Sequence, residues 1–321
     1  MGTWQRYKKA LAGEALPAAL VDLDALDRNL ATLTATVSAA GKTVRLASKS
    51  IRVPALLRYI IERSGGAVRG LMTYTARESA LLVAEGHTDL LLAYPTLDRQ
   101  DLDLLASLNR GGAIVRPAVD CEEHVAALES AASRARARIP VVIDVDMSYR
   151  AALGAVHLGV RRSPLHRTRD VVALAERVSA SASLSFAGLL AYEAQIAGVT
   201  DQSPFARWKN PAKRAMKLLS RPQVERTRAD LCAALRARGI FTPLFNGGGT
   251  GSALWCSRED ALTEVTIGSG FLASHLFDYY RDQRLVPAAY FALQVTRLPA
   301  DGIVTCHGGG FVASGAALCP R

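Results

Sequence analysis

The segment TVRLAS (43–48), followed directly by Lys49 and Ser50, sets the pattern that decides the fold. It is a short, mostly apolar run that ends abruptly in polar residues. A run of this length is typical of a strand buried on both faces of a parallel sheet. Similar runs recur along the chain. They are separated by Ala-, Leu-, Arg- and Glu-rich stretches with helical spacing, such as ARESALLVAEG (76–86).

Strands of this kind are predicted at eight places: TVRLAS (43–48), AVRGLMTY (67–74), DLLLAYP (89–95), AIVRPAV (113–119), PVVIDVD (140–146), FAGLLAY (186–192), TPLFN (242–246) and EVTIG (264–268). Eight strand–helix repeats predict an α/β fold, a parallel sheet closed as a TIM-type (β/α)8 barrel. An open doubly wound sheet is the alternative. It usually has fewer strands and favours a GxGxxG turn after the first strand, which this sequence lacks. We predict that the barrel spans residues 15–280.

The character of the sequence changes after residue 285. VPAAYFALQVTRLP (286–299) and DGIVTCHGGGFVASG (301–315) predict strands joined by a turn, the start of a β-rich domain over residues 285–321. Two or three strands cannot bury a core by themselves. We therefore expect this domain to be incomplete and the sequence to be a fragment or a truncated relative of a longer protein.

Composition narrows the classes of function. The net charge is +10 over 321 residues, but the basic residues are dispersed, and RARAR (134–138) has no interleaved aromatics. This favours a solvated basic surface or an anionic ligand over nucleic-acid binding. Apolar runs fall well short of the roughly 18–20 residues that a membrane span needs, and the N-terminus lacks the apolar core of a signal peptide. We expect a cytoplasmic protein that binds neither nucleic acid nor membrane.

The five cysteines are odd in number and scattered. We found no CxxC motif, no paired Cys/His spacing and no HxxxH pair. This argues against a disulfide framework and against a metal site within this chain.

Lys49 differs from the other lysines by its position. It alone directly follows an apolar strand, whereas the rest lie in polar segments: Lys8, Lys9, Lys42, Lys209, Lys213 and Lys217. The carboxyl ends of barrel strands surround the active sites of barrel enzymes. There, desolvation and nearby cations lower the pKa of an amine enough for Schiff-base chemistry. The alternative is a strand-end lysine that extends to water.

Two glycine-rich loops follow the seventh and eighth predicted strands. FNGGGTGS (245–252) allows backbone N–H groups to approach a ligand closely, and Gly268-Ser269-Gly270 supplies a neighbouring loop. Barrels often bind phosphate near these two strands. A flexible loop is the alternative. A Walker A loop is excluded because no lysine follows the glycines.

Two other residues are candidates for contact with a planar ligand. Tyr192 ends the sixth predicted strand, where its ring either lies against the ligand or packs in the core. Arg150 follows Asp146. It either donates to a phenolic oxygen of that ligand or lies on the surface.

Together these motifs resemble a known family. They occur in the order LVDLDAL (20–26), VRLASKSIR (44–52), DVDMSYR (144–150), LGVRRSP (158–164), GLLAYEAQIAG (188–198), NGGGTGS (246–252) and TIGSGF (266–271). Over about residues 15–315 the chain resembles the alanine-racemase-like, fold-type-III enzymes that depend on pyridoxal 5′-phosphate (PLP). It is most similar to the D-threonine aldolase and D-serine dehydratase branch, of the amino acid deaminase/aldolase type.

The resemblance implies a role for each candidate residue. Lys49 matches the family's Schiff-base lysine and Tyr192 the residue that stacks on the pyridine ring, both assigned as catalytic. Arg150 matches an arginine near the cofactor's phenolic oxygen, and Thr266 replaces the arginine that alanine racemases place against the pyridine nitrogen. The remaining cofactor-binding residues by this resemblance are Asn246, Gly248, Gly249, Thr250, Gly268 and Ser269.

The implied activity is that of a PLP-dependent lyase acting on D-β-hydroxy amino acids, by retro-aldol cleavage or by deamination, in a homodimer. The alternatives are an amino-acid racemase and a non-catalytic PLP-binding protein. The branch also implies a divalent metal, bound near the C-terminus by a histidine and a nearby cysteine or aspartate. Nothing after His307 provides that pair, so we expect no metal ligands in this chain.

Overall fold

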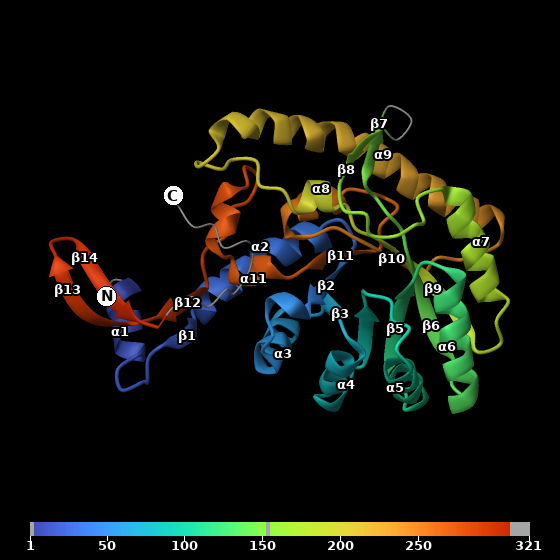
Figure 1. Ribbon diagram of the computed structural model, residues 1–321, viewed down its shortest axis with the longest axis horizontal. Coiled ribbons are helices and arrows are strands. Elements are labelled where there is room, and N and C mark those ends of the chain that lie inside the picture. The colour runs from blue at the N-terminus through green and yellow to red at the C-terminus, as the bar shows by residue number, and fades with distance from the viewer. Residues whose placement is uncertain (1–2, 152–154, 309–321) are drawn as a thin grey trace.

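A computed structural model describes residues 3–151 and 155–308 of the chain (Figure 1). Its centre is a closed barrel of eight parallel strands in the order β10-β11-β2-β3-β4-β5-β6-β9. Their bounds are β2 (Thr43–Ala47), β3 (Val68–Thr73), β4 (Asp89–Leu92), β5 (Ile114–Val119), β6 (Ile139–Asp144), β9 (Leu184–Ala191), β10 (Leu244–Gly247) and β11 (Glu264–Ile267). Each coincides with a predicted segment, so the predicted (β/α)8 barrel is confirmed.

Helices cover the outside of the barrel (Figure 1). The longer ones are α2 (Leu23–Ser38), α3 (Pro54–Arg63), α4 (Ala76–Ala84), α5 (Arg99–Arg110), α6 (Glu122–Ala135), α7 (Thr168–Ser179) and α9 (Asn210–Ala237). Several begin where the sequence supplies an N-cap: the side chain of Asp22 accepts from Ala25 N at 3.1 Å, and that of Asp98 accepts from Asp101 N at 3.0 Å. The apolar faces of the helices and strands form one large buried core.

Short elements follow several barrel strands and shape the end of the barrel where those strands finish. They are η1 (Ser48–Ser50), the hairpin β7 (Tyr149–Ala151) and β8 (Val156–Leu158), α8 (Ala194–Ala197), η3 (Arg207–Lys209), η4 (Thr250–Ser252), α10 (Ala253–Cys256), α11 (Ser269–Leu272) and η5 (His275–Tyr279).

The two ends of the described chain meet outside the barrel. After α1 (Thr3–Ala10), strand β1 (Ala18–Val21) pairs antiparallel with β12 (Ala289–Ala292). Strands β13 (Gln294–Ala300) and β14 (Ile303–His307) then form a hairpin that projects away from the barrel (Figure 1). Strands are thus found in both predicted C-terminal segments. Residues 309–315 of the second segment lie outside the described residues.

Within residues 3–151 and 155–308, no helix is both long and apolar enough to cross a membrane.

Candidate active site

A cavity of about 840 Å³, including its open mouth, lies where the carboxyl ends of the barrel strands converge. It is lined by every predicted site residue except Arg150: Lys49, Tyr192, Asn246, Gly248, Gly249, Thr250, Thr266, Gly268 and Ser269. Residues from four different barrel strands or the turns after them are thus brought to one place, as the barrel topology predicts.

Lys49 lies in η1, the single turn that follows β2. The Lys49 side chain is exposed to solvent and lines the cavity. Protein atoms nevertheless crowd the amine, and its Nζ is 4.4 Å from the centroid of the Tyr74 ring. Burial, with a smaller contribution from the positive charge of Arg162, lowers the pKa of Lys49. A lowered pKa increases the fraction of neutral amine, the form that acts as a nucleophile.

Backbone N–H groups from the turns after β10 and β11 lie at the cavity. The first N–H groups of any helix have no partner within that helix, and η4 and α11 begin side by side after β10 and β11. Gly270 N donates to Thr250 Oγ1 at 3.1 Å, which ties the two turns together. The N–H groups of Thr250, Gly251 and Ser269 therefore begin short helices at the cavity, where an anion would be stabilised.

Glycine is needed in these turns because neighbouring chains approach too closely for a side chain. A Cβ on Gly251 would lie 2.2 Å from the carbonyl oxygen of Ala197, and one on Gly268 would lie 2.8 Å from Ala47 Cβ. Gly248 also adopts a φ of +80°, which favours glycine. Close contact and backbone conformation both account for the glycine-rich sequence.

A buried charge cluster behind the first loop holds it in position. Glu193 accepts from Gly248 N at 3.1 Å and from Ser252 Oγ at 2.6 Å, and it pairs with Arg228. Arg228 also donates to Glu259 at 2.5 Å. Burial raises the pKa of Glu259 to about 7, whereas the Arg228 charge and these hydrogen bonds hold the pKa of Glu193 below its usual value. These contacts explain why the loop is fixed. Arg228 was not among the residues predicted from the sequence.

Tyr192 and Arg162 form another wall. The Cζ atom of Arg162 lies 6.0 Å from the centroid of the Tyr192 ring. Arg162 Nε donates to Asp144 Oδ1 at 2.9 Å and to Asp144 Oδ2 at 2.7 Å, and Nη2 donates to the carbonyl of Ala93 at 3.0 Å. Burial raises the pKa of Asp144 to about 6 even though the guanidinium opposes the shift. Burial also raises the pKa of Tyr192 to about 12, so its hydroxyl stays neutral.

Thr266 is held by a hydrogen-bonded chain that reaches into the barrel. Asn246 Nδ2 donates to Thr266 Oγ1 at 2.8 Å and to Glu264 Oε1 at 2.7 Å. Glu264 in turn accepts from Arg45 Nε at 2.5 Å. The group that these hydrogen bonds hold at the cavity is the neutral hydroxyl of Thr266.

Arg150 lies outside the cavity. Its Nη2 donates to Asp146 Oδ2 at 2.6 Å beside a separate small pocket with Ser148 and Gln223. The arginine at the cavity is Arg162, which sequence analysis did not select. A signal was present, because Arg162 belongs to the motif LGVRRSP (158–164).

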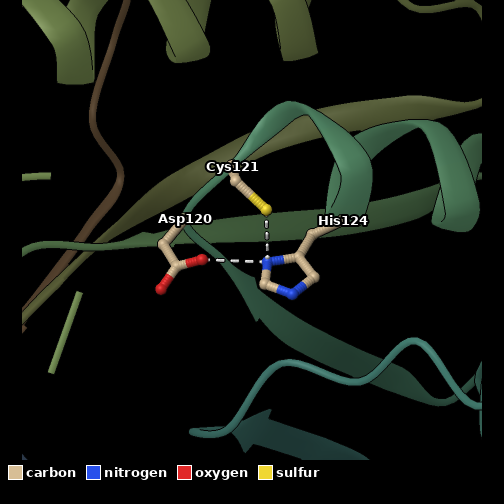
Figure 2. A group of neighbouring side chains, drawn as sticks. All are labelled: Asp120, Cys121 and His124. Carbon is tan, nitrogen blue, oxygen red and sulfur yellow. Dashed lines mark hydrogen bonds and ion pairs between the residues drawn. The ribbon is translucent and has the colours of Figure 1, made fainter. Parts of the chain in front are cut away.

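The sequence analysis also overlooked a group of potential metal ligands. Asp120, Cys121 and His124 place one oxygen, one sulfur and one nitrogen within 4.8 Å of one another (Figure 2). The statement that no cysteine and histidine are paired is therefore wrong. The spacing Cys-x-x-His at the start of a helix was the signal.

Fold and cavity together define a barrel enzyme site with a strand-end lysine and a glycine-rich anion cradle. A family model, the alanine racemase N-terminal domain, matches residues 21–273. The chain belongs to this family. Its members depend on PLP, so the resemblance noted in the sequence is confirmed.

Characterised relatives are distant. The chain is 26% identical over 253 residues to the 3-hydroxy-D-aspartate aldolase of Paracoccus denitrificans, covering 79% of this chain and 59% of the relative. It is 29% identical over 262 residues to the D-threo-3-hydroxyaspartate dehydratase of a Delftia species, covering 78% and 60%. The chain thus spans about three fifths of the length of these curated relatives.

Solved structures show the same fold. The D-threonine aldolase of Filomicrobium marinum superposes with a TM-score of 0.78 at 24% identity, covering 93% of this chain and 74% of the other.

The residues at the cavity fit PLP. The lysine supplies an amine with a lowered pKa. The glycine turns bring backbone N–H groups to the cavity at positions where neighbouring protein atoms leave no room for a Cβ. The tyrosine supplies a ring and the threonine a neutral hydroxyl.

Proposed function

We propose that the chain is a PLP-dependent lyase acting on D-β-hydroxy amino acids, with Lys49 as the residue that holds the cofactor covalently. The observation that carries the proposal is the convergence of Lys49, Tyr192 and the glycine turns on one cavity. The curated relatives named as aldolases and a dehydratase of such substrates support the choice of reaction class.

Each side chain has a defined task in this proposal. When bound, PLP supplies an electron sink that stabilises negative charge at Cα of an amino acid. The N–H groups of Thr250, Gly251 and Ser269 would hold its phosphate, and the Tyr192 ring would contact the cofactor. Thr266 offers a neutral hydroxyl where alanine racemases have an arginine, so this chain places no extra cation at that position.

Lys49 would have a second task besides holding the cofactor. The lowered pKa leaves part of the freed amine neutral at Nζ, where it accepts a proton on one face of the site. Arg162 stays at a fixed position beside it because Asp144 holds its guanidinium. A fixed positive charge next to the amine adds to the effect of burial in lowering the pKa of Lys49.

A divalent metal and a partner subunit belong to the same proposal. A solved structure of a D-threo-3-hydroxyaspartate dehydratase is described as a cysteine-to-alanine mutant in its metal-free form, which supports a role for metal in that enzyme. We further propose that the chain works as a cytoplasmic homodimer.

The test is a product assay on the PLP-loaded chain with added divalent metal. Cleavage of D-threonine to glycine and an aldehyde supports the aldolase. Release of ammonia and a keto acid from D-serine or D-threo-3-hydroxyaspartate supports the dehydratase. Racemisation of D-alanine without either product would replace the lyase by a racemase. Bound PLP with no turnover of any of these would leave only a PLP-binding protein.

A further inference from the structure

A cluster of three chemically different side chains lies at the carboxyl end of β5, on the same end of the barrel as the cavity. Asp120 follows that strand and is buried, Cys121 is the N-cap residue of α6, and His124 lies in the first turn of that helix (Figure 2). None of the three lines the cavity. They therefore form a separate group that the proposed reaction does not use.

Two contacts within the cluster share one nitrogen atom, His124 Nδ1. His124 Nδ1 lies 2.9 Å from Asp120 Oδ1 and 3.2 Å from Cys121 Sγ. A ring nitrogen carries either one proton or one lone pair. With a proton it serves the carboxylate but cannot accept from the thiol. Without one it accepts from the thiol but faces the carboxylate with lone pair against lone pair. A proton on Nδ1 serves the carboxylate well and the sulfur, a weak acceptor, poorly, whereas a cation placed among the three atoms would bind all of them.

The spacing of the three atoms is close to that of a tetrahedral metal site. Zinc bonds of about 2.0–2.3 Å to nitrogen, oxygen and sulfur imply ligand–ligand separations of about 3.4–3.6 Å. His124 Nδ1 lies about 0.3–0.5 Å closer than this to Asp120 Oδ1 and to Cys121 Sγ. All three ligand atoms lie within 4.8 Å of one another. Cys121 and His124 are half-buried, which gives an ion a path to the site from solvent.

We propose that Asp120, Cys121 and His124 bind a divalent cation of the zinc class, with a fourth position left for water. The donor set selects the metal. A thiolate and an imidazole favour borderline and soft cations, whereas Mg²⁺ and Ca²⁺ prefer oxygen ligands alone. Binding releases the thiol proton to solvent and leaves the sulfur as a thiolate ligand. The site goes beyond the proposed lyase reaction and does not depend on it.

Alkylation of the full-length chain tests the proposal one cysteine at a time. The chain is treated with iodoacetamide, with and without Zn²⁺, and the labelling rate of each cysteine is followed by peptide mass spectrometry. A thiolate bound to zinc is shielded, so Cys121 should be labelled at least about tenfold more slowly with Zn²⁺ and unchanged with Mg²⁺. Half-buried Cys232 and exposed Cys306 are the internal controls and should be labelled equally with and without Zn²⁺.

Variants distinguish zinc binding by all three side chains from zinc binding by Cys121 alone. His124→Gln keeps the thiol and should remove the protection, whereas the matched control His166→Gln, at a half-buried histidine outside the cluster, should retain it. Asp120→Asn keeps the shape of the side chain and should weaken the protection, which covers the case in which His124→Gln fails to fold. Labelling of Cys121 that does not respond to Zn²⁺, or protection that persists in folded His124→Gln and Asp120→Asn, would overturn the proposal.

Discussion

At the scale of single residues, the arginine at the cavity is Arg162. Its positive charge is one of the two causes that lower the pKa of Lys49. In Arg162→Gln the pKa of Lys49 should rise, so the neutral amine forms only at higher pH. The pH midpoint of PLP incorporation, followed by absorbance, should therefore move upward.

Arg150→Gln is the matched control, because Arg150 pairs with Asp146 outside the cavity. Its pH midpoint should equal that of the unmodified chain. A shift in Arg150→Gln with none in Arg162→Gln would restore the assignment made from sequence.

Asp144 makes a second prediction at this scale. Its pKa of about 6 in the folded chain exceeds the value of about 3.9 for an unperturbed aspartate. The folded state therefore holds a proton that the unfolded state has lost between these values, so stability falls as pH rises through them. The contribution is about 3 kcal/mol once both states are ionised.

Asp144→Asn isolates this contribution, because the variant cannot titrate at that position. The difference in free energy of unfolding, unmodified chain minus variant, should decrease by about 3 kcal/mol from about pH 4 to pH 7 in urea titrations. A difference that stays constant with pH would contradict the burial of an ionisable Asp144.

At the scale of elements, the turn between β11 and α11 depends on glycine. A Cβ on Gly268 would lie 2.8 Å from Ala47 Cβ and 2.9 Å from Ser50 Oγ, on either side of Lys49. Gly268→Ala should lower the free energy of unfolding by about 1–3 kcal/mol through overpacking and should weaken PLP binding. Urea unfolding and PLP titration measure the two effects.

Gly111→Ala supplies the comparison at a glycine far from the site. Its Cβ would meet nothing closer than 3.4 Å, so stability and PLP affinity should both stay near those of the unmodified chain. Equal effects of the two substitutions would show that the turn after β11 has no special role.

The sequence predicted elements better than it predicted contacts between them. All eight barrel strands were predicted because each carries its own apolar run, and polar residues mark each carboxyl end. The glycine turns were predicted for the same local reason. Arg162 was missed because the hairpin β7–β8 lies between it and Asp144, and no local period relates the two residues.

At the scale of the whole molecule, the pairing of β1 with β12 joins segments some 270 positions apart in sequence. Hydrophobic periodicity describes single elements and not the pairing of distant ones, so this contact could not be predicted from the sequence. The hairpin β13–β14 that follows is exposed along both strands and carries the apolar side chains Leu298, Ile303 and Val304. In the proposed homodimer, a second copy would cover exposed apolar surface of this kind.

The proposed homodimer is tested at this scale. Sedimentation velocity should give about twice the chain mass of 34.3 kDa, because a second copy would bury apolar surface that one chain leaves in water. A single species at 34.3 kDa across the concentration range would contradict the dimer.

The central claim is that Lys49 carries PLP. The direct measurement is to incubate the full-length chain with PLP, reduce with borohydride, digest, and locate the pyridoxyl-lysine by mass spectrometry. The account predicts a label on Lys49 and none on Lys42, which lies in the turn before β2. A label on another lysine, or no label on a folded chain, would contradict it.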